Sequence, residues 1–396
     1  MDKKKFIIKV FNNISDRGLN MFPEERYIID RNSISPDIIL LRSENLKNYL
    51  FPDNLIAIAR AGAGTNNIPV TALTKLGIPV FNTPGANANA VKELVLAGLL
   101  IAARNLIQAS NFINHLNGND NDVINKSVES AKKDFIGFEL PGKTLGILGL
   151  GAIGVQVANM ALELGMDVIG FDENISVDRA WQLSSGVKQA KSIQELFSSS
   201  EIISLHIPSN DKTKGIINSE LLSKMKRGSI ILNFARGDIV NNDDIIDSID
   251  SGLIDNYVSD FPDLRHMDNP KIISLPHLGA STLEAEENCS IMAVKNIIDF
   301  VENGNIHLSV NFPEAKLTRK SKNRLVITNS NIPNMVGQVS TSLADSGINI
   351  ADLVNVSRND IAITIIDIDG AVDQQELKNI SSIEGVLSVR LLEALS

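Results

Sequence analysis

Arg236 and His277 are the side chains whose chemistry stands out in this chain of 396 residues. Arg236 follows an apolar run in Asn233–Asp238, and His277 lies in Pro276–Thr282, between another apolar run and a predicted helix. A guanidinium can hold a carboxylate through two parallel hydrogen bonds, and an imidazole can accept a hydroxyl proton near neutral pH. The pair therefore suits the oxidation of a 2-hydroxy acid. Taken singly, Arg236 would also fit a structural ion pair and His277 a place in the core.

A glycine-rich run predicts the site of the oxidant. Gly149-Leu150-Gly151-Ala152-Ile153-Gly154 lies between a predicted strand and a predicted helix. In this setting the glycines allow a tight turn, the approach of a pyrophosphate and close packing of the helix, whose N-terminus attracts phosphates. Asp172 ends the following strand, where a carboxylate binds ribose hydroxyls and repels a 2′-phosphate. The motif predicts NAD rather than NADP as cofactor, although Asp172 alone would pass for a surface residue.

Two loops of small and polar residues predict the place of the substrate. Ala61–Asn67 and Asn82–Asn89 each follow a predicted parallel strand. Small side chains let a ligand approach the backbone, and ligands of parallel sheets bind at the carboxyl ends of the strands. We therefore expect these loops to form a ligand crevice.

The composition is that of an ordinary globular protein and excludes several classes. Hydrophobic residues make up 43% of the chain, and the net charge is −10. No apolar run reaches the roughly 18 residues that cross a bilayer, and the first residues lack the pattern of a signal peptide. We expect a cytoplasmic protein that binds neither membranes nor nucleic acid, and the single cysteine, Cys289, excludes an internal disulfide and a cysteine-based metal site. No metal is expected. The one basic cluster, Lys316–Arg324, is interpreted as a solvated linker.

Apolar runs alternate with helical patterns over most of the chain, which predicts an α/β protein with two doubly wound parallel sheets. The first sheet is expected to bind the substrate, and the second, a Rossmann domain, the dinucleotide. A helix beginning near Ser281, which has capping-box spacing with Glu284, is expected to return the chain to the first domain. The predicted strands are Phe6–Val10, Ile38–Arg42, Leu55–Arg60 and Pro79–Asn82, then Thr144–Leu148, Asp167–Phe171, Ile202–Leu205, Ser229–Phe234, Tyr257–Ser259 and Ile272–Leu275.

The last segment predicts a third domain with a different sheet. Its expected elements have the order βαββαβ, which is typical of a ferredoxin-like domain. It contains no histidine or cysteine, so binding or assembly is expected rather than chemistry. The predicted domains are residues 1–89 with 282–316 for the substrate, 90–281 for NAD, and 317–396 for this third domain. Its expected strands are Arg324–Thr328, Ile350–Val356, Ile361–Ile368 and Val386–Leu391, and its expected helices are Val336–Asp345 and Gln374–Ile383.

Together these motifs make the chain similar to the D-isomer-specific 2-hydroxyacid dehydrogenases, and within them to the branch that oxidises 3-phosphoglycerate and carries a C-terminal ACT domain. The resemblance implies NAD-dependent oxidation of D-3-phosphoglycerate to 3-phosphohydroxypyruvate, the first step of L-serine biosynthesis, with amino-acid feedback through the ACT domain. It also implies a homodimer or homotetramer. Besides the C-terminal domain, it rests on Arg60–Gly64, Asn82–Asn87, Leu148–Gly154, Asn233–Val240 and Pro276–Thr282.

The same resemblance implies roles for individual residues. Arg236 and His277 become the catalytic pair, and Lys92 becomes a further anion ligand. Arg60, with the loop of Ala61, Gly62, Ala63 and Gly64, would hold the phosphate or carboxylate of the substrate. The implied cofactor contacts are Gly149, Gly151, Ala152, Ile153, Gly154, Asp172, His206, Ile207, Pro208, Phe234, Ala235, Arg236, Ser259, Asp260, Gly279 and Ala280.

The chain departs from the family at the carboxylate that supports the catalytic histidine. The family usually has a glutamate soon after an Asp-Phe-Pro-like turn, whereas this chain reads Asp260-Phe261-Pro262-Asp263-Leu264-Arg265-His266. We predict that Asp263 takes this part and reaches His277 directly or through a water, since a carboxylate there fixes the tautomer and stabilises the cation. The alternative is that Asp263 is a surface turn residue and His277 works with a weaker partner.

In the ACT domain the resemblance points to an amino-acid effector, with L-serine the favoured ligand. Asn331 and Asn349 match the polar positions that hold serine in such domains, whereas Asn329 stands where they often have histidine. The alternative is a purely structural dimerisation module. For the whole chain two alternatives stay open: another enzyme of the family, such as a glyoxylate or hydroxypyruvate reductase, and a non-enzymatic NAD(H)-sensing protein on the same scaffold.

Overall fold

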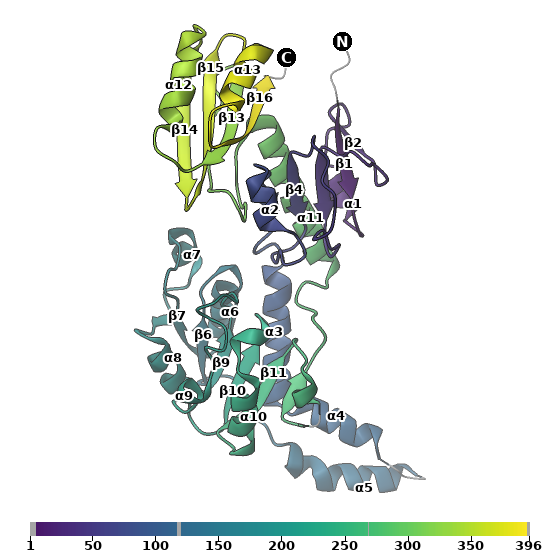
Figure 1. Cartoon of the computed structure of the whole chain (residues 1–396). Coiled ribbons are helices and arrows are strands. Elements are labelled where there is room, and N and C mark those ends of the chain that lie inside the picture. The colour runs from purple at the N-terminus through teal and green to yellow at the C-terminus, as the bar shows by residue number, and fades with distance from the viewer. Residues whose placement is uncertain (1–4, 117–119, 268, 394–396) are drawn as a thin grey trace. The chain divides into compact units, whose positions relative to one another are not determined.

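The computed structural model describes residues 5–116, 120–267 and 269–393 and divides into two compact units. The first unit comprises Met1–Ala86 and Glu286–Ser396, and the second comprises Asn87–Ala285. Each unit contains a parallel sheet, and the first also contains an antiparallel sheet (Figure 1). The predicted fold class, two parallel sheets and a ferredoxin-like sheet, is confirmed. The limits of three separate functional domains stay a prediction.

The parallel sheet of the first unit has the strand order β2-β1-β3-β4-β5, a doubly wound order in which the chain covers both faces. Strand β3 is buried at all four of its residues, as expected for a central parallel strand. The elements are β1 Phe6–Val10, β2 Tyr27–Ile29, β3 Ile38–Leu41, β4 Ala57–Arg60, β5 Val80–Phe81, α1 Asp16–Leu19, α2 Val70–Lys75 and α11 Leu283–Asn303.

The parallel sheet of the second unit has the order β12-β11-β10-β9-β6-β7-β8. The direction in which strands are added reverses between β6 and β9, which is where dinucleotides bind in this topology. The strands are β6 Thr144–Leu148, β7 Asp167–Phe171, β8 Lys188–Gln189, β9 Ile202–Leu205, β10 Ser229–Asn233, β11 Ile254–Ser259 and β12 Ile272–Ser274. The helices are α3 Ala88–Ala103, α4 Leu106–Asn114, α5 Asn121–Ala131, η1 Lys132–Phe135, α6 Ala152–Glu163, α7 Val177–Gln182, α8 Ile193–Ser199, α9 Ser219–Leu222, η2 Gly237–Ile239, α10 Asn242–Asp250 and η3 Leu264–His266.

Side-chain caps fix where several of these helices begin. Ser192 accepts a hydrogen bond from the backbone N–H of Glu195 at the start of α8. Asn241 accepts from the first turn of α10 in the same way. Such caps satisfy N–H groups that have no partner inside the helix, and each stabilises its helix by about 1 kcal/mol.

The antiparallel sheet has the order β14-β15-β13-β16. One face packs against α12 and α13 through a core that includes Leu325, Ile327 and Ile366. The other face contributes Val326 and Ile363 to the main core of the first unit. The elements are β13 Asn323–Ser330, α12 Met335–Asp345, β14 Asn349–Arg358, β15 Ile361–Asp369, α13 Gln374–Ser381 and β16 Val386–Glu393.

Two predictions differ from the structure: the number of strands and the interpretation of the basic cluster. The strands β2 and β8 were not predicted; both residues of β8 are exposed, so it carries no apolar pattern, and backbone pairing alone defines it. The interpretation of Lys316–Arg324 as a solvated linker agrees with the exposed Lys316, Lys320 and Lys322. It was wrong for Arg324, which is fully buried and forms an ion pair with Asp367. Within the described parts of the chain, no helix combines the length and the apolar character required to span a membrane.

Candidate active site

The turn between β6 and α6 has the shape of a dinucleotide-binding turn. Gly149 has a φ of +94°, in the left-handed region that favours glycine. A Cβ atom on Gly154 would lie 1.9 Å from the carbonyl oxygen of Gly149, so α6 packs on the turn more closely than a side chain allows. A Cβ atom on Gly151 would meet nothing within 4 Å. Open space therefore lies over the N-terminus of α6, where a pyrophosphate can approach backbone N–H groups.

Asp172 is held at the edge of this turn. Its Oδ2 accepts a hydrogen bond from the backbone N–H of Leu150 at 2.7 Å, and its Oδ1 accepts one from that of Asn174 at 2.8 Å. Each carboxylate oxygen can accept more than one hydrogen bond, so ribose hydroxyls can still be bound. The arrangement places a fixed negative charge beside the glycine turn and disfavours a 2′-phosphate there.

His206 follows β9, on the other side of the point where the strand order reverses. Its Nε2 lies 2.8 Å from the hydroxyl of Ser204, while its buried Nδ1 has no hydrogen-bond partner in the part of the chain that the structure describes. Burial lowers the pKa of His206 to about 3, so the ring is neutral near pH 7. A buried nitrogen without a partner is costly, and a ligand in the crevice would supply one.

The remaining predicted cofactor residues follow the strands of the same sheet. Since all the strands are parallel, their carboxyl ends lie along one edge. The open space over Gly151, the placed charge of Asp172 and the orphan Nδ1 of His206 together fit a bound NAD. Individual contacts stay a prediction for Ala152, Ile153, Ile207, Pro208, Phe234, Ala235, Arg236, Ser259, Asp260, Gly279 and Ala280.

Asn233 positions the backbone of Arg236, a relation that the sequence analysis missed. Arg236 follows β10, and its exposed side chain donates from Nη1 to the carbonyl oxygen of Ala235 at 2.6 Å. The buried Asn233 donates from Nδ2 to the carbonyl oxygen of Arg236 at 2.9 Å and to the hydroxyl of Tyr257 at 3.0 Å. Asn233 is a polar residue at the end of the apolar run of β10, and this position is the signal in the sequence that could have identified its role.

His277 follows β12 and lies beside a buried carboxylate. Its ring meets the ring of Phe261 edge to face, with the centroids 4.8 Å apart. Asp260, which directly follows β11, the strand paired with β12, is only 1% exposed, and its Oδ1 has no hydrogen-bond partner among the residues described. Burial raises the pKa of the Asp260 carboxyl, whereas the charge of His277 and hydrogen bonds from the backbone of Gly279 and Leu278 oppose this rise. The carboxyl group of Asp260 therefore interacts electrostatically with His277.

Asp263 has other partners than the predicted one. Its two oxygens accept hydrogen bonds from the Nε and Nη2 of Arg265, both at 2.9 Å. Its Oδ2 also accepts from the Nδ2 of Asn242 at 3.0 Å. The hydrogen bonds from Arg265 hold the pKa of Asp263 well below its usual range. The carboxylate thus anchors the turn that carries Arg265, and its role beside His277 stays a prediction.

The predicted substrate residues are divided between the two units. In the first unit, the loop Ala61–Gly64 follows β4, and Arg60 donates from Nε to the carbonyl oxygen of Arg42 at 2.9 Å. A Cβ atom on Gly62 would lie 2.3 Å from the Nη1 of Arg60, so the glycine makes room for the guanidinium. In the second unit, Lys92 lies on α3 and donates to the Oδ1 of Asn89 at 2.6 Å.

The predicted effector residues lie at opposite ends of the antiparallel sheet. Asn331 follows β13 and donates to the carbonyl oxygen of Asn359 at 2.9 Å. Asn349 begins β14 and donates to the Oδ2 of Asp369 at 2.9 Å. A cavity of about 160 Å³ lies at the end that contains Asn331, and it does not include Asn349. Its lining is Asn329, Asn331, Ile332, Asn334, Met335, Val336, Gly337, Asn355 and Ala362.

The chain is similar to known proteins in sequence and in fold. Residues 97–280 match the family described as "D-isomer specific 2-hydroxyacid dehydrogenase, NAD binding domain". The chain is 32% identical over 352 residues to the D-3-phosphoglycerate dehydrogenase of Haemophilus influenzae, which covers 85% of this chain and 81% of the relative. It is 31% identical over 355 residues to the enzyme of the same name from Escherichia coli K12, covering 86% and 82%.

Solved structures of related dehydrogenases have a similar fold. The NAD+-bound 3-phosphoglycerate dehydrogenase of Entamoeba histolytica is 26% identical, with a TM-score of 0.59 over 78% of this chain and 99% of that chain. The D-mandelate dehydrogenase of Rhodotorula graminis has a TM-score of 0.65 at 21% identity, over 80% of this chain and 99% of its own, which shows a common fold alone.

Proposed function

Because the chain belongs to the D-isomer-specific 2-hydroxyacid dehydrogenases, and among them to the family of the D-3-phosphoglycerate dehydrogenases, we propose that it oxidises D-3-phosphoglycerate to 3-phosphohydroxypyruvate. It is an NAD-dependent oxidoreductase. The observation that carries the proposal is the placement of Arg236 and His277 at the carboxyl edge of the sheet that bears the glycine turn and Asp172.

Arg236 and His277 divide the chemistry between them. Arg236 binds the substrate carboxylate through its planar fork and thereby orients the C2 carbon. His277 accepts the proton of the C2 hydroxyl, so that the carbonyl forms as the C2 hydrogen leaves as hydride. Bound NAD supplies the hydride acceptor. Oxidation of the alcohol thus releases one proton to His277 and one hydride to the cofactor, which balances the reaction.

Asp260 supports His277 in this scheme. The imidazolium that forms during proton transfer needs a negative charge nearby, and a buried carboxylate provides one that water screens little. The unpartnered Oδ1 of Asp260 and the effect of the His277 charge on the pKa of Asp260 support this assignment. The glutamate that the family usually has after this turn is absent, so Asp260 carries the charge from a different position.

The substrate phosphate is assigned to Arg60 and the Ala61–Gly64 loop. The loop offers small residues and an arginine at the carboxyl end of β4, where ligands bind in parallel sheets. Lys92, at the start of α3 in the second unit, is proposed as a further anion ligand. Phosphate binding at this loop would distinguish 3-phosphoglycerate from smaller hydroxy acids that lack the phosphate.

A substrate comparison tests the proposal. Purified protein is mixed with NAD and with D-3-phosphoglycerate, D-glycerate or glycolate, and NADH is followed by its absorbance; the reverse reaction is run with glyoxylate and hydroxypyruvate. D-3-phosphoglycerate should give the highest kcat/KM. A higher kcat/KM with glyoxylate or hydroxypyruvate would identify a reductase of that kind, and no turnover of any substrate would leave a non-enzymatic NAD(H)-sensing protein.

The C-terminal sheet is assigned an amino-acid effector, with L-serine first among the candidates. The 160 Å³ cavity beside Asn329 and Asn331 supports this, since it has the size of a small amino acid and an amide-rich wall. Asn349 lies at the other end of the sheet, so it can share this ligand only from a second copy of the chain. Isothermal calorimetry with serine and glycine, together with rates at each concentration, tests the assignment.

A homodimer or homotetramer in the cytoplasm is part of the same proposal. Helix α4 has no buried residue and exposes Leu106 and Ile113, each 48% accessible. Apolar side chains left open on an outlying helix support pairing with a second copy. Light scattering of the purified protein measures the number of copies.

A further inference from the structure

The C-terminal module, residues 323–393, is built into the first unit rather than attached to it. Gly304, which follows α11 with a φ of +71°, would bring a Cβ atom to 2.2 Å from the Cγ2 of Val326. Gly77, also with a φ of +71°, would bring one to 2.5 Å from the Oγ1 of Thr328. The hydroxyl of Thr328 also donates to the carbonyl oxygen of Gly77 at 3.3 Å. Strand β13 thus packs directly on two glycine turns of the first unit, one after α2 and one after α11.

Three arginines satisfy the end of α11. The last carbonyl groups of a helix have no partner inside the helix, and positive charge is favoured there by the helix dipole. In this chain three successive carbonyl groups each receive an arginine from the linker or the module. The contacts are Arg390 Nη2 to Val301 O at 3.2 Å, Arg319 Nη1 to Glu302 O at 3.0 Å and Arg324 Nη1 to Asn303 O at 2.8 Å.

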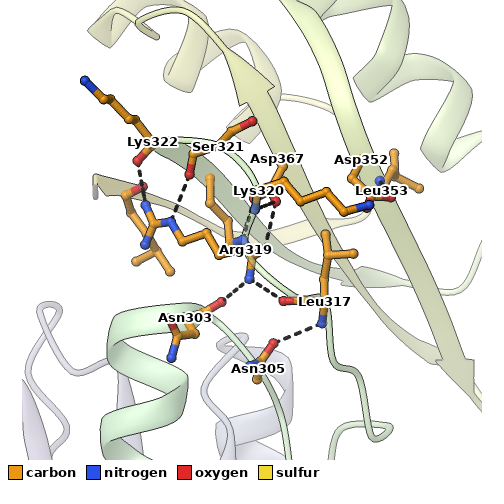
Figure 2. A network of polar contacts seen from close by, with 12 residues as sticks. Asn303, Asn305, Leu317, Arg319, Lys320, Ser321, Lys322, Asp352, Leu353 and Asp367 are labelled. Carbon is orange, nitrogen blue, oxygen red and sulfur yellow. Dashed lines mark hydrogen bonds and ion pairs between the residues drawn. The ribbon is translucent and has the colours of Figure 1, made fainter. Parts of the chain in front are cut away.

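Arg324 joins this helix end to the sheet of the module. Its Nε and Nη2 donate to the two carboxylate oxygens of Asp367, at 2.6 and 3.0 Å, and both side chains are 0% exposed. Its Nη1 also donates to the carbonyl oxygen of Leu317 at 2.8 Å. Figure 2 shows Asn303, Leu317 and Asp367 gathered around this network. A buried bidentate pair has one geometry, so a shift of either strand moves the guanidinium with it.

The two strands that carry this ion pair also reach the effector cavity. Strand β13 bears Arg324 near its start and Asn329 near its end, and Asn329 lines the cavity. Strand β15 bears Asp367 near its end and Ala362, a second lining residue, near its start. Helix α11 begins at Leu283, where the chain leaves the second unit.

We propose that the Arg324–Asp367 pair links the C-terminal module to α11 and lets the module control this helix. Through α11 the chain passes from the second unit, which carries the predicted NAD site, to the first unit. The regulatory part of this inference rests on the proposed effector site. An amino acid in the cavity acts on β13 and β15, and the pair passes that change to the last turn of α11. Without the ion pair, the effector should still bind but should no longer change the rate.

A double variant, Arg324→Met with Asp367→Leu, removes both charges and keeps apolar groups of similar volume in their place. The matched control is Lys320→Met, which breaks the adjacent ion pair between Lys320 and Asp352. This pair is 2.6 Å long, its side chains are 64% and 28% exposed, and neither side chain caps α11. If the double variant does not fold, Arg319→Met removes a neighbouring cap of α11 and leaves the buried pair intact. All proteins are full-length, and the probe is L-serine.

Two readouts decide the matter. The double variant should bind L-serine with the wild-type Kd in calorimetry but show no serine-dependent change in rate, whereas the control should keep both. Independently of any effector, hydrogen exchange at the amides of residues 300–304 should be about three- to ten-fold faster in the double variant or in Arg319→Met.

Each outcome has a definite meaning. A rate response that persists in the double variant, or exchange in α11 that matches the control, would overturn the link. If L-serine does not bind the wild-type protein, the effector assignment fails, and the exchange measurement still shows whether the module stabilises α11.

Discussion

Replacing Asp172 should weaken the preference for NAD over NADP. Its carboxylate is fixed by the backbone N–H groups of Leu150, at 2.7 Å, and Asn174, at 2.8 Å, so the charge has one position beside the glycine turn. Asp172→Asn keeps the size and one acceptor oxygen but removes the charge. Asp172→Ala removes the acceptor oxygens as well. The pair of variants therefore separates the effect of charge from that of hydrogen bonding.

The magnitude follows from the kind of hydrogen bond that is lost. A hydrogen bond to a charged group contributes about 1.5–3 kcal/mol, against about 0.5–1.5 kcal/mol for a neutral one. Asp172→Ala should therefore raise the KM for NAD about 10- to 150-fold, and Asp172→Asn about 2- to 10-fold. Both variants also lose the repulsion of the 2′-phosphate, so the ratio of kcat/KM for NAD to that for NADP should fall further than the KM alone suggests.

The assay is the initial rate of NADH or NADPH formation with saturating D-3-phosphoglycerate, for the wild type and both variants. Thermal unfolding serves as the control for folding, because Asp172 also holds the backbone of Leu150. Two results would contradict this role of Asp172: comparable kcat/KM for NAD and NADP in the wild type, or an unchanged ratio of the two in well-folded Asp172→Ala.

Three further substitutions test the rest of the site. Gly154→Ala should cost about 1–3 kcal/mol in free energy of unfolding and weaken NAD binding, since its Cβ would lie 1.9 Å from the Gly149 oxygen; denaturant unfolding and calorimetry measure both, and unchanged values would contradict the geometry. Asp260→Asn should lower kcat yet raise stability near neutral pH. Burial raises the pKa of Asp260 in the folded state, so its carboxyl group favours folding least once it is ionised. The free energy of unfolding should therefore fall as the pH rises from the pKa of the unfolded state to that of the folded state. Urea unfolding from pH 4 to 8 should show this fall in the wild type and not in Asp260→Asn. Asp263→Asn should leave the pH–rate profile unchanged, because Arg265 binds both oxygens of that carboxylate. A shift of the acidic limb, where protonation of His277 stops it from accepting a proton, would support Asp263 as the partner of His277.

The sequence predicted the parts of the fold that depend on local patterns. Buried strands such as β6 and β10 are continuous apolar runs, and the glycine turn after β6 is defined by backbone requirements that only glycine meets. These signals need no knowledge of distant residues. By contrast, β8 is a pair of exposed residues that only its neighbour β7 makes into a strand.

What the sequence does not show are contacts between segments far apart in the chain. The distance from Pro262 along the sequence predicts Asp263 as the partner of His277, whereas pairing of β11 with β12 brings Asp260 beside the segment that carries His277. Arg324 was assigned to a solvated linker because it stands in a basic cluster. Its partner Asp367 lies on another strand of the sheet, and no local pattern reveals a buried ion pair of that kind.

The most direct test of the account is hydride transfer by His277→Asn. D-3-phosphoglycerate labelled with deuterium at C2 is mixed with NAD and either the wild-type protein or the variant, and the labelled NADH is quantified by mass spectrometry. We expect transfer of deuterium to NAD by the wild-type protein and a rate about 10²- to 10⁴-fold lower in the variant, with NAD binding unchanged. A folded His277→Asn protein that transfers deuterium at the wild-type rate would contradict this expectation.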